Sequence, residues 1–224
     1  MKIALISANC GNWDVEKEWM PQVIPAGDEL FVYRLNDRNW PMRIRAMAPK
    51  MQSTIPKFFG WQMFPDMDVY IWADASRLIV RDDFITWMID QLGDADMALC
   101  RHPDRTSIEQ EARYVKYHVN SKHEYLYKRY SHEWIDEQFL VIKSDPLFED
   151  NMLYTTTFLA YHPTEAVQAA TTEWWYHFTR YHILDQLALP YVVWKHNVKV
   201  NIIEGIETVP HIRRFGRSIL ENGV

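Results

Sequence analysis

The sequence predicts an α/β fold with a central, mainly parallel sheet that is flanked by helices. Short apolar runs alternate with segments of helical periodicity along the 224 residues, and this alternation is typical of parallel strands joined by crossover helices. Hydrophobic residues make up 48% and charged residues 24% of the chain, a balance that excludes disorder as its main state. The length predicts a single domain over residues 1–224.

The first half of the chain supplies most of the expected strands. Apolar, strand-like runs occupy residues 2–7, 29–33, 68–72 and 96–100, and a short strand is expected at 78–80. A helix is expected over about 43–59, interrupted by Pro49 and Pro56, because proline lacks the N–H that a helix interior needs. Residues 82–92 predict a further helix that opens on acidic residues.

The second half predicts longer helices and two more strands. Residues 106–109 have the form of a capping box, with Glu109 as its acid, and a polar helix is expected from there to about residue 130. Residues 152–161 are rich in Tyr, Thr and Phe and predict a strand. A helix over 164–181 and a strand over 198–203 follow.

Charge and cysteine content narrow the class of protein. The formal net charge of −6 argues against a broad surface for duplex nucleic acid. The two cysteines, Cys10 and Cys100, lie beside apolar runs and are expected to be buried thiols. No apolar stretch approaches the roughly 18–20 residues of a membrane span, and residues 1–7 are too short for a signal peptide. A cytoplasmic location is therefore expected.

Several common enzyme classes lose their support because their motifs are absent. The sequence has no G-x-G-x-x-G, no G-x-x-x-x-G-K-[ST], no G-x-S-x-G and no H-E-x-x-H, which argues against dinucleotide oxidoreductases, P-loop enzymes, α/β-hydrolases and zincins. Ligands of α/β sheets bind at the carboxyl ends of the strands. Polar residues that directly follow strands are therefore the strongest functional candidates.

The sharpest such signal is Asp74-Ala75-Ser76, which follows an apolar strand that ends Tyr70-Ile71-Trp72. A carboxylate in this place can hold a divalent cation that binds a diphosphate, although it can also simply open a turn. The serine supplies a weaker ligand than a second aspartate would.

In order along the chain, five blocks resemble a known family. The blocks are Lys50, Phe64-Pro65, Trp72 to Ser76, His102-x-x-Arg105 with Glu111-Ala112, and Trp174-Trp175 with Asp185-Gln186. They are similar to the glycosyltransferase-like domain of the plant turgor-regulation-defect and mucilage-related proteins, which also occurs in bacteria and phages. The resemblance spans about residues 3–211. Leu184 departs from it, because the family usually has Arg before Asp-Gln.

The resemblance implies a GT-A-like, Rossmann-type glycosyltransferase that takes its sugar from a nucleoside-diphosphate sugar. It implies a nucleotide-sugar-binding half at about 1–105 and an acceptor-side half with a C-terminal tail at about 106–224. The acceptor would be a saccharide or another hydroxyl compound. The implied donor-binding residues are Ala8, Asn9, Gly11, Asp14, Lys50, Asp74, Ser76, His102, Arg105 and Gln186.

The resemblance also implies a divalent cation, Mn²⁺ or Mg²⁺, held by Asp74 and Ser76. His211 is the expected further metal ligand, with His196 as second choice. Asp185 and Glu111 are the candidate catalytic acids, either of which could serve as general base if the reaction inverts the anomeric centre; Glu109 is a weaker candidate. A basic cluster near the C-terminus could clamp the diphosphate; it comprises Arg213, Arg214 and Arg217.

Three alternatives stay open at this point. The acceptor could be a modified base in nucleic acid, as for some phage enzymes, although the acidic balance disfavours it. The chain could instead be a non-catalytic carbohydrate-binding protein on a degenerate GT-A fold, for which Ser76 and Leu184 are the support. A metal-dependent phosphohydrolase is weaker, because Asp74 has few Asp and His residues near it in the sequence.

Overall fold

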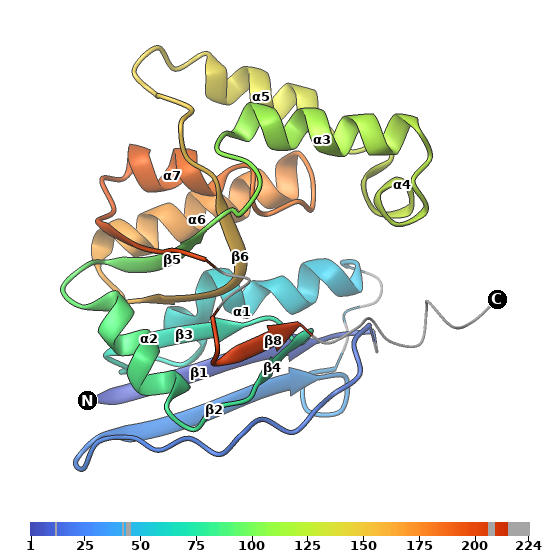
Figure 1. Ribbon diagram of the computed structural model, residues 1–224. Coiled ribbons are helices and arrows are strands. Elements are labelled where there is room, and N and C mark those ends of the chain that lie inside the picture. The colour runs from blue at the N-terminus through green and yellow to red at the C-terminus, as the bar shows by residue number, and fades with distance from the viewer. Residues whose placement is uncertain (12, 42, 44–45, 206–208, 215–224) are drawn as a thin grey trace.

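The computed structural model describes residues 1–224 except 12, 42, 44–45, 206–208 and 215–224, and a six-stranded sheet forms its centre (Figure 1). Every strand of the sheet except β6 runs in the same direction. In spatial order the strands are β2 (Glu29–Asn36), β1 (Lys2–Asn9), β3 (Val69–Ala73), β6 (Tyr154–Tyr161), β5 (Met97–Arg101) and β7 (Val200–Ile203). The predicted α/β fold with a mainly parallel sheet is confirmed.

Helices cover both faces of the sheet, and each face has its own apolar core. The face that includes Ile6 packs against the larger group of helices, α1 (Pro49–Met63), α3 (Ile108–Asn120), α4 (Glu124–Tyr130), α5 (Ile135–Lys143), α6 (Glu165–Arg180) and α7 (Leu189–Lys195). The face that includes Leu5 packs against α2 (Phe84–Leu92) and the antiparallel ribbon of β4 (Arg77–Ile79) and β8 (Ile212–Arg214). Adjacent residues serve opposite cores because strand side chains alternate.

Helix α1 begins later than the sequence predicts, and the reason is Pro49. This proline occupies the first turn of α1, where its missing N–H would have no partner and its fixed φ suits the helix. The predicted start near residue 43 is therefore wrong. Pro56 does lie inside the helix, where it removes one backbone hydrogen bond, and the backbone departs from helical geometry three residues further on, at Phe59.

Close packing of α1 onto the sheet requires a glycine. A β-carbon at Gly60 would lie 2.7 Å from Ile6 Cδ1 and 2.9 Å from the Tyr161 hydroxyl oxygen. The hydroxyl of Tyr161 also accepts the Trp61 backbone N–H at 3.2 Å. Helix α1 is therefore fixed in depth and register against β1 and β6.

The polar helix expected up to residue 130 is two helices. Helix α3 ends at Asn120 and α4 starts at Glu124, and Lys122 between them has a φ of 55°, a conformation that does not continue a right-handed helix. The cap is also shifted by one residue: Ser107 accepts the Gln110 N–H at 3.1 Å, so Gln110 and not Glu109 takes the reciprocal position. The sequence did not predict α5, α7 or β8.

The two halves expected from the sequence share one sheet. Strand β6, from the second half, lies between β3 and β5 of the first, and β7 adds the edge beyond β5. Both cysteines are buried and free, as expected. Within the described part of the chain, no helix has the length and apolar character that crossing a membrane requires.

Candidate active site

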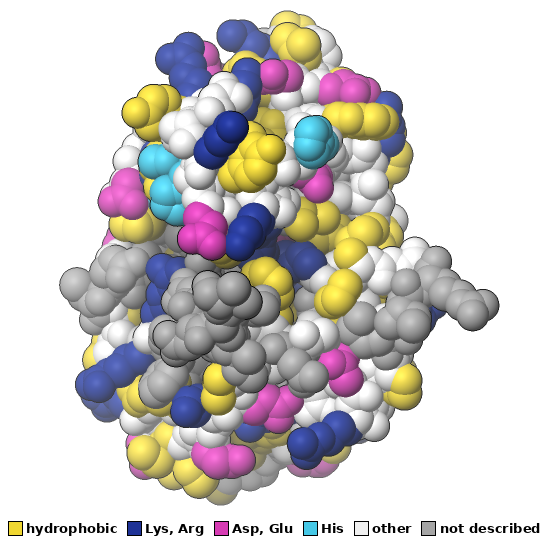
Figure 2. Space-filling model, turned by 90° about the vertical axis from the view of Figure 1, so that its right-hand side faces the viewer, with side chains coloured by type: hydrophobic (Ala, Val, Ile, Leu, Met, Phe, Trp, Pro, Cys, Tyr) yellow, Lys and Arg dark blue, Asp and Glu magenta, His cyan; other side chains and the backbone are white. Residues whose placement is uncertain are grey.

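Charged side chains meet at the carboxyl ends of β1 and β3, the edge where α/β sheets bind ligands. Figure 2 views the molecule from the side toward which the arrows of β1 and β2 point in Figure 1, and Lys and Arg side chains lie near the middle of that face. The residues that carry the site come from α1, the turn after β3, strand β6, helix α4 and the loop between α6 and α7.

Asp74 begins a turn directly after β3, and hydrogen bonds hold both its backbone and its carboxylate. Its backbone carbonyl accepts the Arg77 N–H at 2.8 Å, and Oδ1 accepts the indole N–H of Trp72 at 2.7 Å. Ser76 lies within the same turn and is half-buried. The turn-forming role expected of this aspartate is therefore present, while its carboxylate stays half-exposed at the edge of the sheet.

Lys57 of α1 links two carboxylates at the centre of the site. Its ammonium nitrogen lies 2.6 Å from Asp185 Oδ2 and 3.5 Å from Asp74 Oδ1. The side chain is only 1% exposed, and it lies 5.6 Å from the ring centroid of Trp72. A fully buried ammonium needs such partners to remain charged, and the two carboxylates raise the pKa of Lys57 against the opposing effect of its burial.

Asp185 is fixed from both its side chain and its backbone. Its backbone carbonyl accepts the indole N–H of Trp174 at 2.6 Å, and its carboxylate also accepts a hydrogen bond from Thr156 of β6. Burial opposes the charged form, but Lys57 and Lys50 together lower the pKa of Asp185 to about 2. A carboxylate with so low a pKa is a poor proton acceptor, so the structure favours Asp185 as the anchor of Lys57.

Two more cations, Lys50 and Arg129, interact with this pair of carboxylates. Burial lowers the pKa of Lys50, Asp185 and Asp74 oppose that shift, and the positive charges of Arg129 and Lys57 add to it. Arg129 at the end of α4 interacts with the same two carboxylates. Its Nε is buried and has no hydrogen-bond partner among the described residues. The cluster therefore combines three cations with two anions.

A second group follows β5 and contains His102, Arg105 and Glu111. Arg105 donates to the Glu111 carboxylate and its Nη2 lies 2.9 Å from His102 Nε2. Its guanidinium also lies 4.1 Å from the ring centroid of Tyr114. Burial raises the pKa of Glu111, whereas burial and the Arg105 charge lower the pKa of His102 to about 4. The three expected residues thus form one network with a neutral imidazole.

The residues after β1 form a fixed loop at the same edge. Ala8 and Asn9 end the strand and are buried, and the Asn9 side chain exchanges hydrogen bonds of 2.6 and 3.0 Å with the backbone of Asp14. The Gly11 N–H donates to the Asp37 carboxylate at 2.9 Å. Gly11 has a φ of 75°, and a β-carbon there would lie 2.8 Å from Pro49 Cβ, so the position requires glycine.

Of the expected metal ligands, Asp74 and Ser76 lie in one turn, but His211 lies elsewhere. His211 stacks on Trp87 of α2 at 4.6 Å between ring centroids, and its Nε2 lies 3.3 Å from Asp83 Oδ1. His196 instead donates from Nε2 to the Glu173 carboxylate at 2.7 Å. Among the described residues, no group of three or more His, Cys, Asp or Glu side chains could hold a metal ion.

The remaining candidates are placed as follows. Gln186 donates to the Tyr154 carbonyl at 3.4 Å, next to the cluster's Asp185. Glu109 pairs with Arg113 one turn further along α3 at 2.5 Å. Arg213 and Arg214 are exposed on β8, where Arg214 pairs in register with Arg77 just after the Asp74 turn. Arg217 lies outside the described residues.

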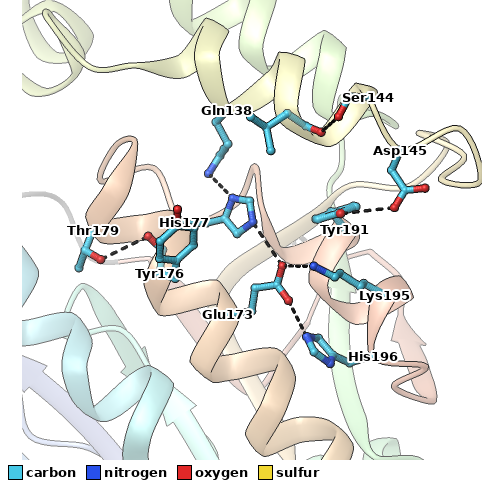
Figure 3. A network of polar contacts seen from close by, with 11 residues as sticks. Gln138, Ser144, Asp145, Glu173, Tyr176, His177, Thr179, Tyr191, Lys195 and His196 are labelled. Atoms are coloured by element: carbon cyan, nitrogen blue, oxygen red, sulfur yellow. Dashed lines mark hydrogen bonds and ion pairs between the residues drawn. The ribbon is translucent and has the colours of Figure 1, made fainter.

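A buried polar chain supports the loop that carries Asp185. His182 Nδ1 accepts the Leu184 N–H at 3.1 Å, and its Nε2 lies 2.7 Å from Gln138 Oε1. Gln138 continues to His177 at 3.3 Å, and His177 lies 3.7 Å from Glu173. Figure 3 shows this end of the chain, where Glu173 lies between His177, Lys195 and His196. This row of hydrogen-bonded side chains therefore anchors the loop that carries Asp185 to α5 and α6.

Two pockets lie away from the charged cluster. One, of about 150 Å³, is lined by residues that include Glu109 and Phe148, and the other, of about 480 Å³, by residues that include Met152 and Trp194. Neither is lined by Asp74, Lys57 or Asp185. The chemistry is therefore located by charge and burial rather than by the shape of these pockets.

Sequence reasoning missed Lys57 and Arg129. It selected Lys50 as the lysine of the first family block, but the structure places Lys57 in direct contact with both carboxylates. A signal was present: Lys57 stands between Pro56 and Phe58-Phe59, and a lysine within an apolar helix face is rarely buried without an ionic partner. Arg129 had no comparable signal, because it lies in a strongly polar helix.

Comparisons with solved structures find glycosyltransferases at low similarity. The WbbM bifunctional glycosyltransferase in its apo form is 14% identical, with a TM-score of 0.41, and the match covers 78% of this chain but only 28% of that one. A glycosyltransferase involved in glycosylation of the major capsid of PBCV-1 is 8% identical, with a TM-score of 0.39 and coverage of 91% and 80%. The galactosyltransferase LgtC, in complex with donor and acceptor sugar analogues, is 10% identical, with a TM-score of 0.39 and coverage of 92% and 73%.

These TM-scores are too low to support a function, and no curated protein matches the sequence. The family assignment depends instead on a family model that matches residues 45–208. That range contains Lys57, Asp74, Arg129 and Asp185, and hence the whole charged cluster. The chain belongs to the family of the TOD1/MUCI70 glycosyltransferase-like domain.

Proposed function

We propose that this chain is a glycosyltransferase that moves a sugar from a nucleoside-diphosphate sugar to a hydroxyl acceptor. The observation that carries the proposal is the buried Lys57 ammonium between Asp74 and Asp185 at the carboxyl edge of the sheet. A stable core does not require such a cluster, because buried ion pairs contribute little net stability compared with apolar packing. Perturbed charged groups at a ligand-binding edge are typical of functional sites.

In the proposed arrangement the donor lies across the ends of β1 and β3. The nucleoside lies near Ala8, Asn9, Gly11 and Asp14, because β1 pairs with the strand that ends at Asp74 and the Asn9 side chain is hydrogen-bonded to the backbone of Asp14. The diphosphate lies by the Asp74 turn, where Lys50 and Arg129 offer positive charge. The sugar then points toward His102 and Arg105 after β5. These placements divide the binding of the donor among strand ends of one sheet edge.

The transfer step itself is a displacement at the anomeric carbon. The acceptor oxygen forms a bond to that carbon as the bond to the diphosphate oxygen breaks, and the electron pair leaves with the diphosphate. Cationic groups stabilise the developing negative charge on the leaving group. The hydroxyl proton passes to a carboxylate or to the departing diphosphate. If the reaction inverts configuration, Glu111 is the proposed base, because burial raises its pKa while that of Asp185 is lowered to about 2.

The divalent cation expected from the sequence stays a prediction. The residues expected to hold it are Asp74, Ser76 and His211, and His211 is engaged with Trp87 and Asp83 instead. The donor set that remains is one carboxylate and one hydroxyl, whereas Mg²⁺ and Mn²⁺ favour octahedral sets of oxygen ligands.

A non-catalytic binder on the same fold is the second candidate. One observation favours it: both expected catalytic acids are buried and paired with a cation, Asp185 with Lys57 and Glu111 with Arg105, so neither accepts a proton until its ion pair opens. Such a protein would bind the nucleotide sugar at the same site and leave it intact.

The test is a thermal-shift screen with nucleoside diphosphates and nucleoside-diphosphate sugars. It is followed by an assay for release of the nucleoside diphosphate when acceptors are supplied. A ligand present at 100 times its Kd stabilises the folded state by about 2.7 kcal/mol. We expect a shift with one nucleobase that is reduced in Arg129→Gln and kept in Lys128→Gln, an exposed neighbour on α4. Binding without release across an acceptor panel favours the binder, and no shift with any nucleotide contradicts both candidates.

A further inference from the structure

The cluster around Asp74 has the charge of an anion-binding site. The ammonium of Lys57 contacts two carboxylates, Asp74 and Asp185, and the charges of Lys50 and Arg129 interact with the same two carboxylates. Each carboxylate is within ion-pair distance of the Lys57 ammonium, at 3.5 and 2.6 Å. The three cations therefore exceed the two anions by one charge. A site built for a divalent cation has the opposite balance, because its carboxylates must outnumber the cations around them.

Lys57 also occupies the space that a bridging metal ion would need. Its ammonium lies between the two carboxylates, and its side chain is 1% exposed. Asp74 Oδ1 already receives the Trp72 indole N–H at 2.7 Å. A divalent ion bound to the same oxygens would meet the Lys57 charge at contact distance in a poorly solvated place, where like charges repel strongly. The residues present therefore do not fit a metal shared by Asp74 and Asp185.

We propose that this chain binds the diphosphate of its donor without a divalent metal, through a built-in cation cluster in which Lys57 neutralises Asp74 and Asp185 while Lys50 and Arg129 contact the phosphate oxygens. This inference rests on the proposed function, because it names how the same site holds the leaving group.

The two outer cations are suited to phosphate. The Arg129 guanidinium is oriented by its Nη1, which donates to the Tyr125 hydroxyl at 2.5 Å, and its buried Nε has no partner among the described residues. A planar guanidinium with a free N–H can bind phosphate oxygens with two parallel hydrogen bonds. Lys50 is disfavoured as an ammonium by burial and by its cationic neighbours, and a nearby diphosphate would remove that penalty.

Lys57 supplies the fixed part of the arrangement. Because the ammonium is buried and held at two carboxylates, it needs no reorganisation when charge develops on the leaving diphosphate. Preorganised charge of this kind stabilises a transition state more effectively than mobile groups do. Asp185 and Trp174, which hold Lys57 and its loop, are then positioning residues for the cation cluster.

The test measures binding of the nucleoside diphosphate that the thermal screen selects, by calorimetry, in 1 mM EDTA (roughly the level that strips trace divalent ions) and again in excess MnCl₂. We expect binding in EDTA that is at least as tight as in MnCl₂, because side-chain cations and not a metal contact the phosphate oxygens, and Mn²⁺ in solution competes for those oxygens. Binding that appears only with Mn²⁺ overturns this inference and leaves the proposed function standing. Absence of binding under both conditions contradicts the proposed function itself.

Variants show whether the cations make the contact. We expect Arg129→Gln and Lys50→Gln each to weaken binding about tenfold or more, as loss of a charge-assisted hydrogen bond does. Lys128→Gln is the matched control, because Lys128 precedes Arg129 but points to Glu124 at 2.9 Å on the exposed side of α4. Equal affinity of wild type, Arg129→Gln and Lys50→Gln in EDTA overturns the inference.

Discussion

Removing the Lys57 ammonium should destabilise the fold and change how the free energy of unfolding depends on pH in the range where Asp185 titrates. In the wild-type protein, Lys57 and Lys50 lower the pKa of Asp185 from 3.8 to about 2, a shift that corresponds to roughly 2–3 kcal/mol of stability above pH 4. Lys57→Met leaves the buried carboxylate without its partner at 2.6 Å. Loss of one member of a buried pair costs about 3–5 kcal/mol, and that is the loss expected at pH 7.

The sign of the pH effect separates this account from a simple packing defect. In the wild type, the depressed pKa of Asp185 means that its contribution is lost as the pH falls from about 4 to 2. In Lys57→Met, burial without Lys57 raises that pKa above its ordinary value, so protonation on acidification relieves the unpaired charge. The difference in stability between the variant and the wild type should therefore shrink as the pH is lowered.

The assay is urea unfolding across a pH series with the double variant Lys57→Met/Asp185→Asn included. The double variant should be more stable than Lys57→Met alone at pH 7 by about 2 kcal/mol, because the unpaired buried charge is gone. Lys128→Met, an exposed lysine on α4, should leave the unfolding midpoint almost unchanged. Equal stability of Lys57→Met and the double variant at pH 7 would refute the reasoning.

Three further predictions follow from the described contacts. Burial lowers the pKa of His182 from 6.5 to about 4, so the free energy of unfolding should fall by about 3 kcal/mol as the pH falls between these values. In urea unfolding, His182→Asn should reduce this dependence of stability on pH, and an unchanged dependence contradicts the assignment. Gly11→Ala should lower stability by about 1–2 kcal/mol more than Gly27→Ala. Both glycines have a positive φ, but only at Gly11 do atoms lie within 4 Å of the added β-carbon, and equal midpoints of the two variants in thermal unfolding would contradict this prediction. His211→Ala should lower the melting temperature through loss of its stacking on Trp87 while calorimetry shows unchanged nucleotide affinity, and a large affinity loss restores His211 as a ligand.

The parts of the fold that could be predicted are those that local sequence determines. The buried strand that ends at Ala73 is a continuous apolar run, and an aspartate directly after such a strand reaches the ligand-binding edge wherever the strand lies in a parallel sheet. Asp74 was found for this reason. The start of α1 was not predicted, because a proline within a helical pattern suggests a break, whereas Pro49 occupies the first turn of the helix.

The central contact of the site could not be predicted, because it joins distant parts of the chain. Lys57 and Asp185 are 128 positions apart, and nothing in the local pattern of either residue indicates the other. Their pairing depends on how α1 packs on the sheet and on the loop that Trp174 and His182 hold. Lys50 was preferred for the same reason: Lys50 and Lys57 are two turns apart on one helix, and only packing decides which one contacts the two carboxylates.

The position of His211 illustrates a different limit. Its expected role came from its place near the C-terminus, where GT-A enzymes often have a histidine ligand, but strand β8 pairs with β4 so that His211 lies next to Val80 and α2 rather than at the Asp74 turn. A two-stranded ribbon of three residues per strand has too little sequence pattern to set its register in advance.

The most direct measurement is a crystal structure of the protein soaked with the selected nucleoside diphosphate and MnCl₂, with anomalous data collected at the manganese edge. The account predicts diphosphate oxygens within hydrogen-bond distance of Lys50 and Arg129, an intact Lys57 bridge between Asp74 and Asp185, and no anomalous peak between those carboxylates. A diphosphate bound away from this cluster, or a manganese ion that joins the diphosphate to Asp74, would contradict it.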